Sequence, residues 1–172
     1  MRYLALLLLT IFYGCSDPAE EYRRANDAYI ERMNEILEPY GSGDIESSKS
    51  ALLRSIEFTK EEISNRGDHS AFDWELALAY ARLAWIAEYK GKKDEAKRLF
   101  SLASEHEFKS DVLYRERIKN NPNVISTDEH PRTKGYSIED WYSILDEVDS
   151  RYQSKWTKPN QAAHTTPASA PR

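Results

Sequence analysis

The spacing of the apolar residues constrains the fold of this chain more than any other feature of its sequence. Over residues 20–120, and again over 138–156, they recur mostly at every third or fourth position within each segment, which places them on one side of an α-helix. No stretch shows the strict alternation of apolar and polar residues that is typical of a half-buried β-strand. We therefore predict an all-α fold of about six helices packed as antiparallel hairpins.

Glycine, proline and polar clusters divide this pattern into separate helices. Ser70 is predicted to cap the third helix, with Asp73 as its partner in a capping box. Gly91 is predicted to end that helix, and Ser137 to cap the last one. The six predicted helices begin at about residues 20, 44, 71, 94, 110 and 138.

Two segments of the chain differ in composition from the helical part. The polar stretch at 121–135 is long for a connection within a compact helical domain, so it is interpreted as either mobile or functional. The segment 157–172 contains no large apolar residue and cannot bury enough surface to offset its ordering entropy. We therefore predict one helical domain at 19–156, followed by a disordered tail at 157–172.

The first fifteen residues form a short apolar segment that ends in a cysteine. Arg2 precedes an apolar run over residues 3–13, which is too short to span a bilayer and fits the core of a signal peptide. Gly14 stands directly before Cys15, which is the only cysteine in the chain. This segment resembles the leader of a bacterial lipoprotein. The alternative is an ordinary secretory leader that ends near a cysteine.

The lipoprotein resemblance implies both a modification and a location. It implies a cleaved signal peptide at 1–14, a palmitate-type lipid on Cys15, and an anchor and short linker at 15–18. Two or three acyl chains would make membrane attachment effectively permanent. In the sorting pattern of two-membrane bacteria, Ser16 after the cysteine favours the outer membrane. We therefore expect a lipid-anchored envelope protein that faces the periplasm, and we favour the outer membrane over the inner membrane as the site of its anchor.

Small residues in the third and fourth predicted helices follow a known pattern. Ala84 and Ala96 would let two antiparallel helices approach closely, and Gly91 would permit the tight turn between them. Leu83 and Phe100 would fill the space beside that contact. In these positions the segment 71–107 resembles one tetratricopeptide repeat.

This resemblance covers a single repeat unit. Phe108 stands where the family has a closing proline, and no second unit follows or precedes at the repeat length. A generic helical hairpin is the alternative interpretation. The family resemblance implies a protein-interaction scaffold whose concave groove holds a peptide or helix of a partner.

Aromatic residues of the third predicted helix are the candidate partner-binding residues. Trp74 and Trp85 lie off the apolar stripe, on one side of the helix, and Tyr89 follows them. An exposed tryptophan is a good interface anchor. The alternative is that another helix covers this side. Trp141 and Trp156 lie on the stripe of the last helix and are predicted to belong to the core.

The sequence offers little support for catalysis or for metal binding. No histidine or cysteine spacing is typical of zinc, and no glycine-rich phosphate loop is present. Residues 68–70 contain the residue types of a hydrolytic triad, but adjacent residues at a turn rarely face one another. We therefore predict no catalytic residues, no metal and no cofactor, and do not expect an enzyme.

The charge pattern and the leader together lead to the expected function. The net charge is −5 and no lysine- or arginine-rich block is present, which argues against nucleic acid as a partner. No small-molecule substrate is evident. We expect a helical adaptor or assembly factor that binds another envelope protein. The alternative is an inhibitor or immunity-type lipoprotein that blocks a periplasmic toxin or enzyme, and an envelope hydrolase ranks third.

Overall fold

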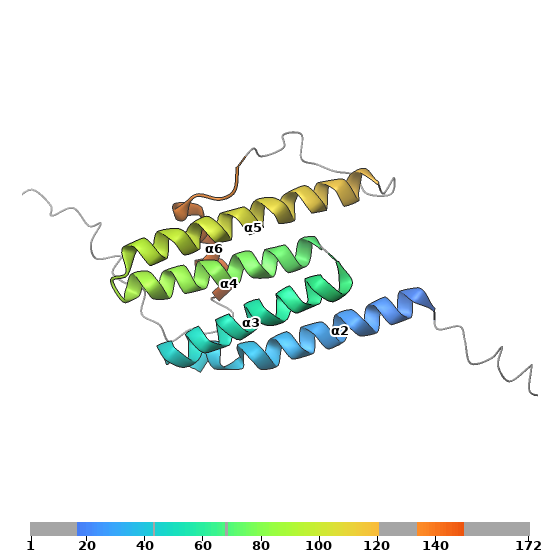
Figure 1. Ribbon diagram of the computed structural model, residues 1–172, viewed down its shortest axis with the longest axis horizontal. Coiled ribbons are helices and arrows are strands. Elements are labelled where there is room, and N and C mark those ends of the chain that lie inside the picture. Colours follow the sequence, from blue (N-terminus) through green and yellow to red (C-terminus); the bar gives the residue numbers. More distant parts are fainter. Residues whose placement is uncertain (1–16, 43, 68, 121–133, 150–172) are drawn as a thin grey trace, which may run out of the picture. The chain divides into compact units, whose positions relative to one another are not determined.

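The computed structural model describes residues 17–42, 44–67, 69–120 and 134–149, and their regular structure is entirely helical (Figure 1). The predicted all-α class is therefore confirmed for this part of the chain. None of the helices in these ranges combines the length and apolar character needed to cross a membrane. The predicted signal peptide, Cys15 and the tail at 157–172 lie outside the described residues. The elements are α2 (Pro18–Leu37), the 3-10 helix η1 (Glu38–Ser42), α3 (Ile45–Arg66), α4 (Ser70–Tyr89), α5 (Lys93–Lys119) and α6 (Ile138–Asp149).

The chain divides into two compact units, Met1–Glu35 and Ile36–Arg172. This boundary falls inside the range 19–156 that the sequence presents as one helical domain. In the first unit the described residues form most of α2, and Asp17 caps this helix by accepting the backbone N–H of Ala19 at 3.0 Å. The second unit contains η1 and the helices α3 to α6.

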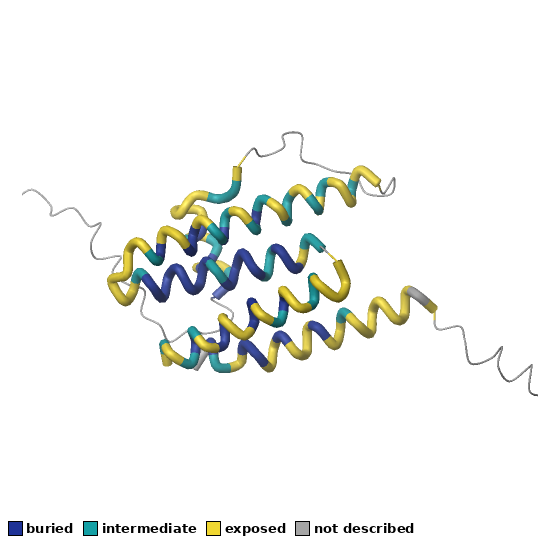
Figure 2. The backbone as a smooth tube through the Cα atoms, in the orientation of Figure 1, coloured by how far each residue is buried: buried dark blue, intermediate teal, exposed yellow. Residues whose placement is uncertain are grey.

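Helix α4 is the central helix of the second unit. It contacts α3, α5 and α6, and 13 of its 20 residues are buried (Figure 2). The sequence suggests one apolar stripe on this helix, with Trp85 beside it. In the structure the burial extends around most of the helix, so the side chain of Trp85 is only 7% exposed.

Helices α4 and α5 form a hairpin with a tight turn. Gly91 adopts a φ of +73°, a left-handed conformation that glycine adopts without strain, and this confirms the predicted end of the helix. Lys92 N–H donates to the carbonyl of Ala87 at 2.9 Å and closes the turn. The residues of the predicted close contact are buried here, namely Leu83, Ala84, Ala96 and Phe100.

Helix α5 is a single helix of 27 residues, about 40 Å long. The prediction of a separate fifth helix beginning near residue 110 is therefore wrong. No glycine or proline interrupts the chain there, and Ser110 does not act as a cap. Its hydroxyl instead donates to the carbonyl of Ser70 at 2.7 Å, which links α5 to the start of α4.

The first turn of α4 also differs from its prediction. The cap is His69 rather than Ser70, because the ring Nδ1 of His69 accepts the backbone N–H of Ala71 at 3.2 Å. Asp73 does not complete a capping box. Its carboxylate is fully buried between α4 and α5, where it faces His106 at 2.9 Å and Lys109 at 3.3 Å.

The cap of α6 is as predicted. Ser137 Oγ accepts the backbone N–H of Asp140 at 3.2 Å, and the Asp140 carboxylate accepts the backbone N–H of Ser137 at 2.9 Å. These two hydrogen bonds form a reciprocal capping box. Tyr152 and Trp156, which the sequence places on the same stripe, lie outside the described residues.

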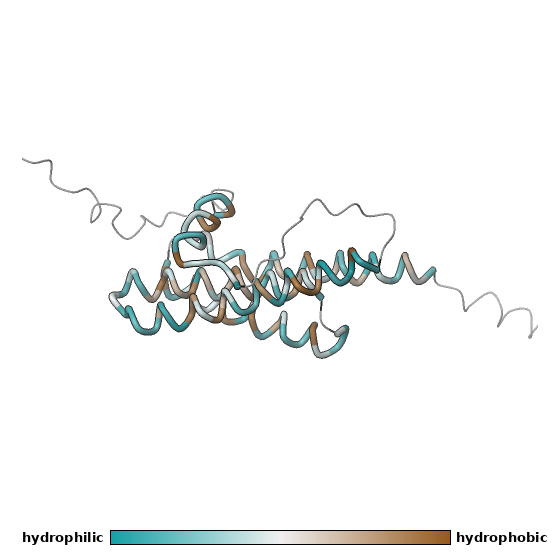
Figure 3. The backbone as a smooth tube through the Cα atoms, turned by 90° about the horizontal axis from the view of Figure 1, so that it is seen from above, coloured by the Kyte–Doolittle hydropathy of each residue, from teal (hydrophilic) through white to brown (hydrophobic). Residues whose placement is uncertain are grey.

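The segment 134–149 docks on the α4–α5 hairpin, with α6 running across it (Figure 3). Trp141 is fully buried, as predicted, and its Nε1 donates to Ser104 Oγ of α5 at 3.1 Å. Ser104 Oγ donates in turn to the carbonyl of Tyr136 at 2.6 Å. A Cβ placed on Gly135 would lie 2.2 Å from the carbonyl oxygen of Ser104, so only glycine fits this approach.

Candidate functional site

Two hollows lie on the second unit, near opposite ends of α4. The first, called the basic groove, occupies about 210 Å³ between α3, α4 and α5. It is lined by Lys49, Leu53, Leu83, Ile86, Ala87, Lys90, Lys92, Glu95, Arg98 and Leu99. The second, called the aromatic–acidic cavity, occupies about 290 Å³. It is lined by Ser70, Ala71, Trp74, Glu107, Ser110, Asp111, Tyr114 and Tyr136.

The basic groove has an apolar floor and a charged rim. Leu83 and Ile86 of α4 and Leu99 of α5 are buried, whereas the side chain of Leu53 from α3 is 45% exposed. Four of the lining residues are lysine or arginine and one is a glutamate. An apolar floor inside a basic rim suits an occupant that is itself amphipathic and acidic.

Ion pairs hold part of this rim in place. Lys90, at the end of α4, pairs with Glu46 of α3, and Lys92 pairs with Glu95 at 3.2 Å. The hydrogen bond and positive charge of Lys90 lower the pKa of Glu46, which stays ionised at neutral pH. The pair between Lys90 and Glu46 therefore links the start of α3 to the end of α4 beside the groove.

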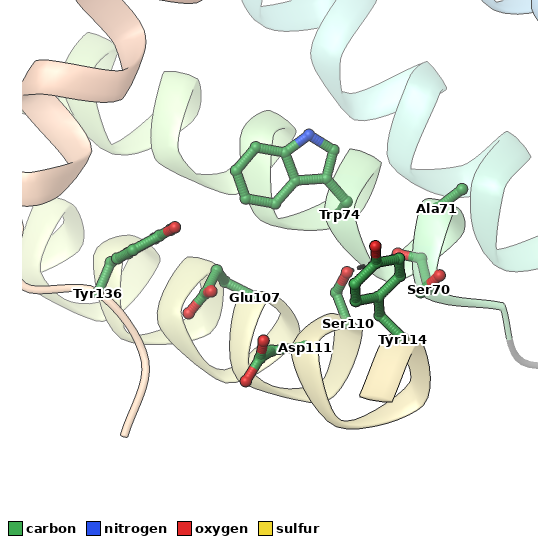
Figure 4. Close-up of a pocket in the computed structure, with 8 residues that line it drawn as sticks. All are labelled: Ser70, Ala71, Trp74, Glu107, Ser110, Asp111, Tyr114 and Tyr136. Atoms are coloured by element: carbon green, nitrogen blue, oxygen red, sulfur yellow. Dashed lines mark hydrogen bonds between the residues drawn. The ribbon is translucent and has the colours of Figure 1, made fainter. Parts of the chain in front are cut away.

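The aromatic–acidic cavity is built from three segments of the chain (Figure 4). Trp74 comes from the first half of α4, and Tyr136 comes from the segment that precedes α6. Glu107, Asp111 and Tyr114 come from successive turns of α5. Glu107 is only 2% exposed, whereas Tyr114 is 53% exposed.

Contacts outside the cavity hold its aromatic walls. Trp74 stacks on Trp141 of α6, with ring centroids 6.1 Å apart and an interplanar angle of 28°. The ring of Tyr136 packs against Trp141 edge to face, with centroids 5.5 Å apart. Trp141 therefore positions two of the three rings that face the cavity.

The carboxylates of the cavity lie on one face of α5. Glu107 and Asp111 are four residues apart, which places them on adjacent turns of the helix. Arg115, one further turn along, donates from Nε to Asp111 Oδ2 at 2.9 Å. The eight lining residues include two carboxylates and neither lysine nor arginine.

A polar cluster lies between α4 and α5, outside both hollows. The buried carboxylate of Asp73 faces His106, and the ring of His106 stacks on Tyr80 with centroids 5.5 Å apart. The hydroxyl of Tyr80 accepts a hydrogen bond from Lys60 Nζ of α3 at 3.0 Å. This chain of contacts connects three helices, so we interpret it as structural.

The predicted partner-binding residues do not form one surface. Trp74 lines the aromatic–acidic cavity, Trp85 is buried, and Tyr89 is 46% exposed but lines neither hollow. Burial of Trp85 agrees with the alternative that other elements cover it. Cys15, the predicted site of lipid attachment, lies outside the described residues.

Sequence reasoning missed most of the residues that line the two hollows. One available signal was the spacing of Glu107, Asp111 and Tyr114, which places these residues on one face of a helix.

In the described parts of the chain, no three histidine, cysteine, aspartate or glutamate side chains are grouped as metal ligands. Compared with models of known protein families, with curated proteins and with solved structures, the chain has no match. Its function must therefore be inferred from the side chains of the groove and the cavity.

Proposed function

We propose that the protein is a lipid-anchored adaptor of the bacterial cell envelope that binds another envelope protein through the basic groove. The observation that carries this proposal is the position of an apolar floor inside a rim of four basic residues, on a chain with a net charge of −5. The anchor on Cys15 and the periplasmic location rest on the leader residues alone.

The groove favours an acidic, amphipathic segment of the partner. Leu53 gives the partner an apolar contact that is already half accessible. Lys49 and Arg98 line the groove on α3 and α5, where they can attract carboxylates of the partner. Apolar contacts would provide most of the affinity, and the charges would orient the segment and accelerate its encounter.

Site-specific crosslinking in the source cells tests where the partner binds. A photoreactive amino acid at position 53 lies in the groove, and one at position 112 provides a control on α5. Val112 is similarly exposed but does not line the groove. We expect one envelope protein to be crosslinked from position 53 and not from position 112. Equal crosslinking from both positions would contradict binding in the groove.

Charge reversal tests the basic rim. The double variant Lys49→Glu and Arg98→Glu should reduce the crosslink from position 53 at least tenfold. Lys97→Glu is the matched control, because Lys97 is exposed on α5 next to Arg98 and does not line the groove. Thermal melting of each variant shows whether it is folded. An undiminished crosslink in the folded double variant would contradict the proposal.

The anchor is tested separately from the groove. Cys15→Ser removes the proposed site of lipid attachment and leaves the groove residues unchanged. We expect this variant to leave the membrane fraction and to lose its crosslink to a membrane-bound partner. If it stays in the membrane fraction, the lipid anchor is refuted, whatever the groove binds.

A further inference from the structure

We propose that the aromatic–acidic cavity binds a small organic cation, with an alkylammonium or guanidinium head group. This inference is independent of the basic groove and of the proposed adaptor role, since it depends on other residues. It concerns the cavity lined by Trp74, Tyr114 and Tyr136 together with two carboxylates of α5.

The aromatic rings provide the first half of the argument. Trp74, Tyr114 and Tyr136 come from three different elements and border one hollow (Figure 4). The face of an aromatic ring carries negative electrostatic potential and attracts cations, with tryptophan the strongest. Rings on several sides are the usual arrangement for an alkylammonium group, because its methyl groups also contact the rings.

The carboxylates provide the second half. Glu107 and Asp111 place two carboxyl groups at the cavity, and no lining residue is a lysine or an arginine. Arg115 pairs with Asp111 from the next turn of α5 but does not line the cavity. Because Arg115 compensates the charge of Asp111, the preference for a cation over an anion or a neutral ligand depends mainly on Glu107 and the rings.

The same residues argue against a hydrated metal ion as the ligand. Calcium takes six to eight oxygen ligands, and magnesium requires a near-ideal octahedron. This cavity presents two carboxylates, and three of its six other lining residues are aromatic. At about 290 Å³ it is at the small end of ligand pockets, which suits a head group with a short alkyl chain.

The walls are held in place before any ligand binds. Trp74 and Tyr136 are both packed on Trp141 of α6. Ser110 donates to the carbonyl of Ser70, which ties α5 to α4 at the cavity. A site that needs little rearrangement loses little affinity to ordering.

Titration of the purified full-length protein in detergent tests the ligand class. Choline and agmatine are the probes, and their binding is followed by calorimetry and by tryptophan fluorescence. The control ligand is 3,3-dimethyl-1-butanol, a neutral molecule with the shape of choline, at constant ionic strength. We expect saturable binding of at least one cation, at least tenfold tighter than that of the neutral alcohol. If neither cation binds more tightly than the alcohol, or if neither shows saturable binding, the proposal is overturned.

Variants of the cavity test its location. Tyr114→Leu and Glu107→Gln should each weaken binding at least fivefold, and Tyr114→Phe should retain it because the ring remains. Tyr22→Leu is the matched control, since it removes a tyrosine that is equally exposed on α2. Tyr114 is half exposed, so its variants remain informative if Glu107→Gln does not fold. Unchanged binding by folded Tyr114→Leu would overturn the assignment.

Discussion

Asp149, the last residue of α6, holds the buried guanidinium of Arg82 at the centre of α4. Asp149 Oδ1 accepts hydrogen bonds from Arg82 Nε at 2.9 Å and from Nη2 at 2.5 Å. Its other oxygen, Oδ2, accepts a hydrogen bond from the hydroxyl of Tyr40 in η1 at 2.8 Å. The guanidinium of Arg82 lies over the ring of Tyr40. Burial raises the pKa of Tyr40 far above its usual value, so the hydroxyl stays a donor. One carboxylate thus connects three segments that are distant in the sequence.

Removal of this carboxylate should destabilise the second unit strongly. In Asp149→Ala the charge of Arg82 stays buried without its partner, which typically costs about 3–5 kcal/mol. Urea denaturation followed by tryptophan fluorescence measures the loss. The control is Glu139→Gln, an exposed carboxylate in the first turn of α6, which should change stability by less than about 0.5 kcal/mol. Equal losses in the two variants would contradict a central role for the ion pair.

A methyl group at position 135 should displace the segment that carries Tyr136. In Gly135→Ala the new Cβ would clash with the backbone of Ser104, which belongs to a helix and cannot yield easily. We expect a loss of about 1–3 kcal/mol and weaker cation binding in the cavity. Lys134→Ala is the control, because Lys134 is exposed beside it. Calorimetric melting and choline titration measure the two effects, and wild-type behaviour of Gly135→Ala would contradict this account.

The features of the fold that depend on local sequence were predictable. The cap by Ser137 and the glycine turn at Gly91 each depend on a few neighbouring residues, and both predictions are confirmed. The predicted division of α5 near residue 110 is wrong, because the polar residues there do not end the helix. They instead contact α4, as the hydrogen bond from Ser110 shows. His69 was missed because histidine is a rare cap.

The two hollows were less predictable than the helices. Periodicity indicates which residues share a helix face, but not which distant segment lies opposite. Trp74 was identified by its residue type, whereas Tyr136 comes to the cavity through the docking of α6 on α4 and α5. The burial of Trp85 likewise depends on how many neighbours surround α4. Which distant segments meet at a hollow depends on long-range packing, and the local sequence pattern does not specify it.

Glu75 should make the protein less stable as pH rises. Burial raises the pKa of its carboxyl in the folded state, and the charge of Arg82 only partly opposes this effect. Between its usual pKa of 4.5 and the raised value, the folded state binds more protons than the unfolded state. The contribution of Glu75 to the free energy of unfolding is therefore fully present below pH 4.5 and is lost as pH rises through the raised pKa.

Substitution of Glu75 by glutamine tests this dependence. Glu75→Gln should melt at a higher temperature than the wild type at pH 7, and the two proteins should converge near pH 4. Glu105→Gln, on the exposed face of α5, controls for the loss of one negative charge. A lower melting temperature for Glu75→Gln at pH 7 would show that its ionised form stabilises the fold.

His69 should give the opposite pH dependence. Burial, followed by the charges of Arg117 and Arg66, lowers the pKa of His69 below its usual 6.5. The unfolded chain therefore takes up the proton first as pH falls, and the cap's contribution is lost as pH falls from about 6.5 through the lowered value. Protonation also removes the acceptor that Nδ1 presents to the N–H of Ala71.

Two substitutions distinguish the effect of the capping hydrogen bond from the effect of protonating His69. His69→Asn keeps a side-chain acceptor and should flatten the pH dependence of stability between pH 5 and 8. His69→Ala should flatten it equally but lose about 0.5–2 kcal/mol at pH 8, because no cap remains. Chemical denaturation at several pH values measures both effects. Equal stability of the two variants at pH 8 would show that the contact with Ala71 contributes nothing.

The short turn at Gly91 has a consequence for the order of folding. Helices α4 and α5 meet through residues that are close in sequence, so their hairpin can form at a small entropic cost. Docking of α6 must instead close the chain between Lys119 and Ile138 before Asp149 reaches Arg82. We expect α6 to dock last during folding and to detach first during unfolding. Since Tyr136 arrives with α6, the cavity is complete only in the fully folded protein, and any ligand held there would favour that state.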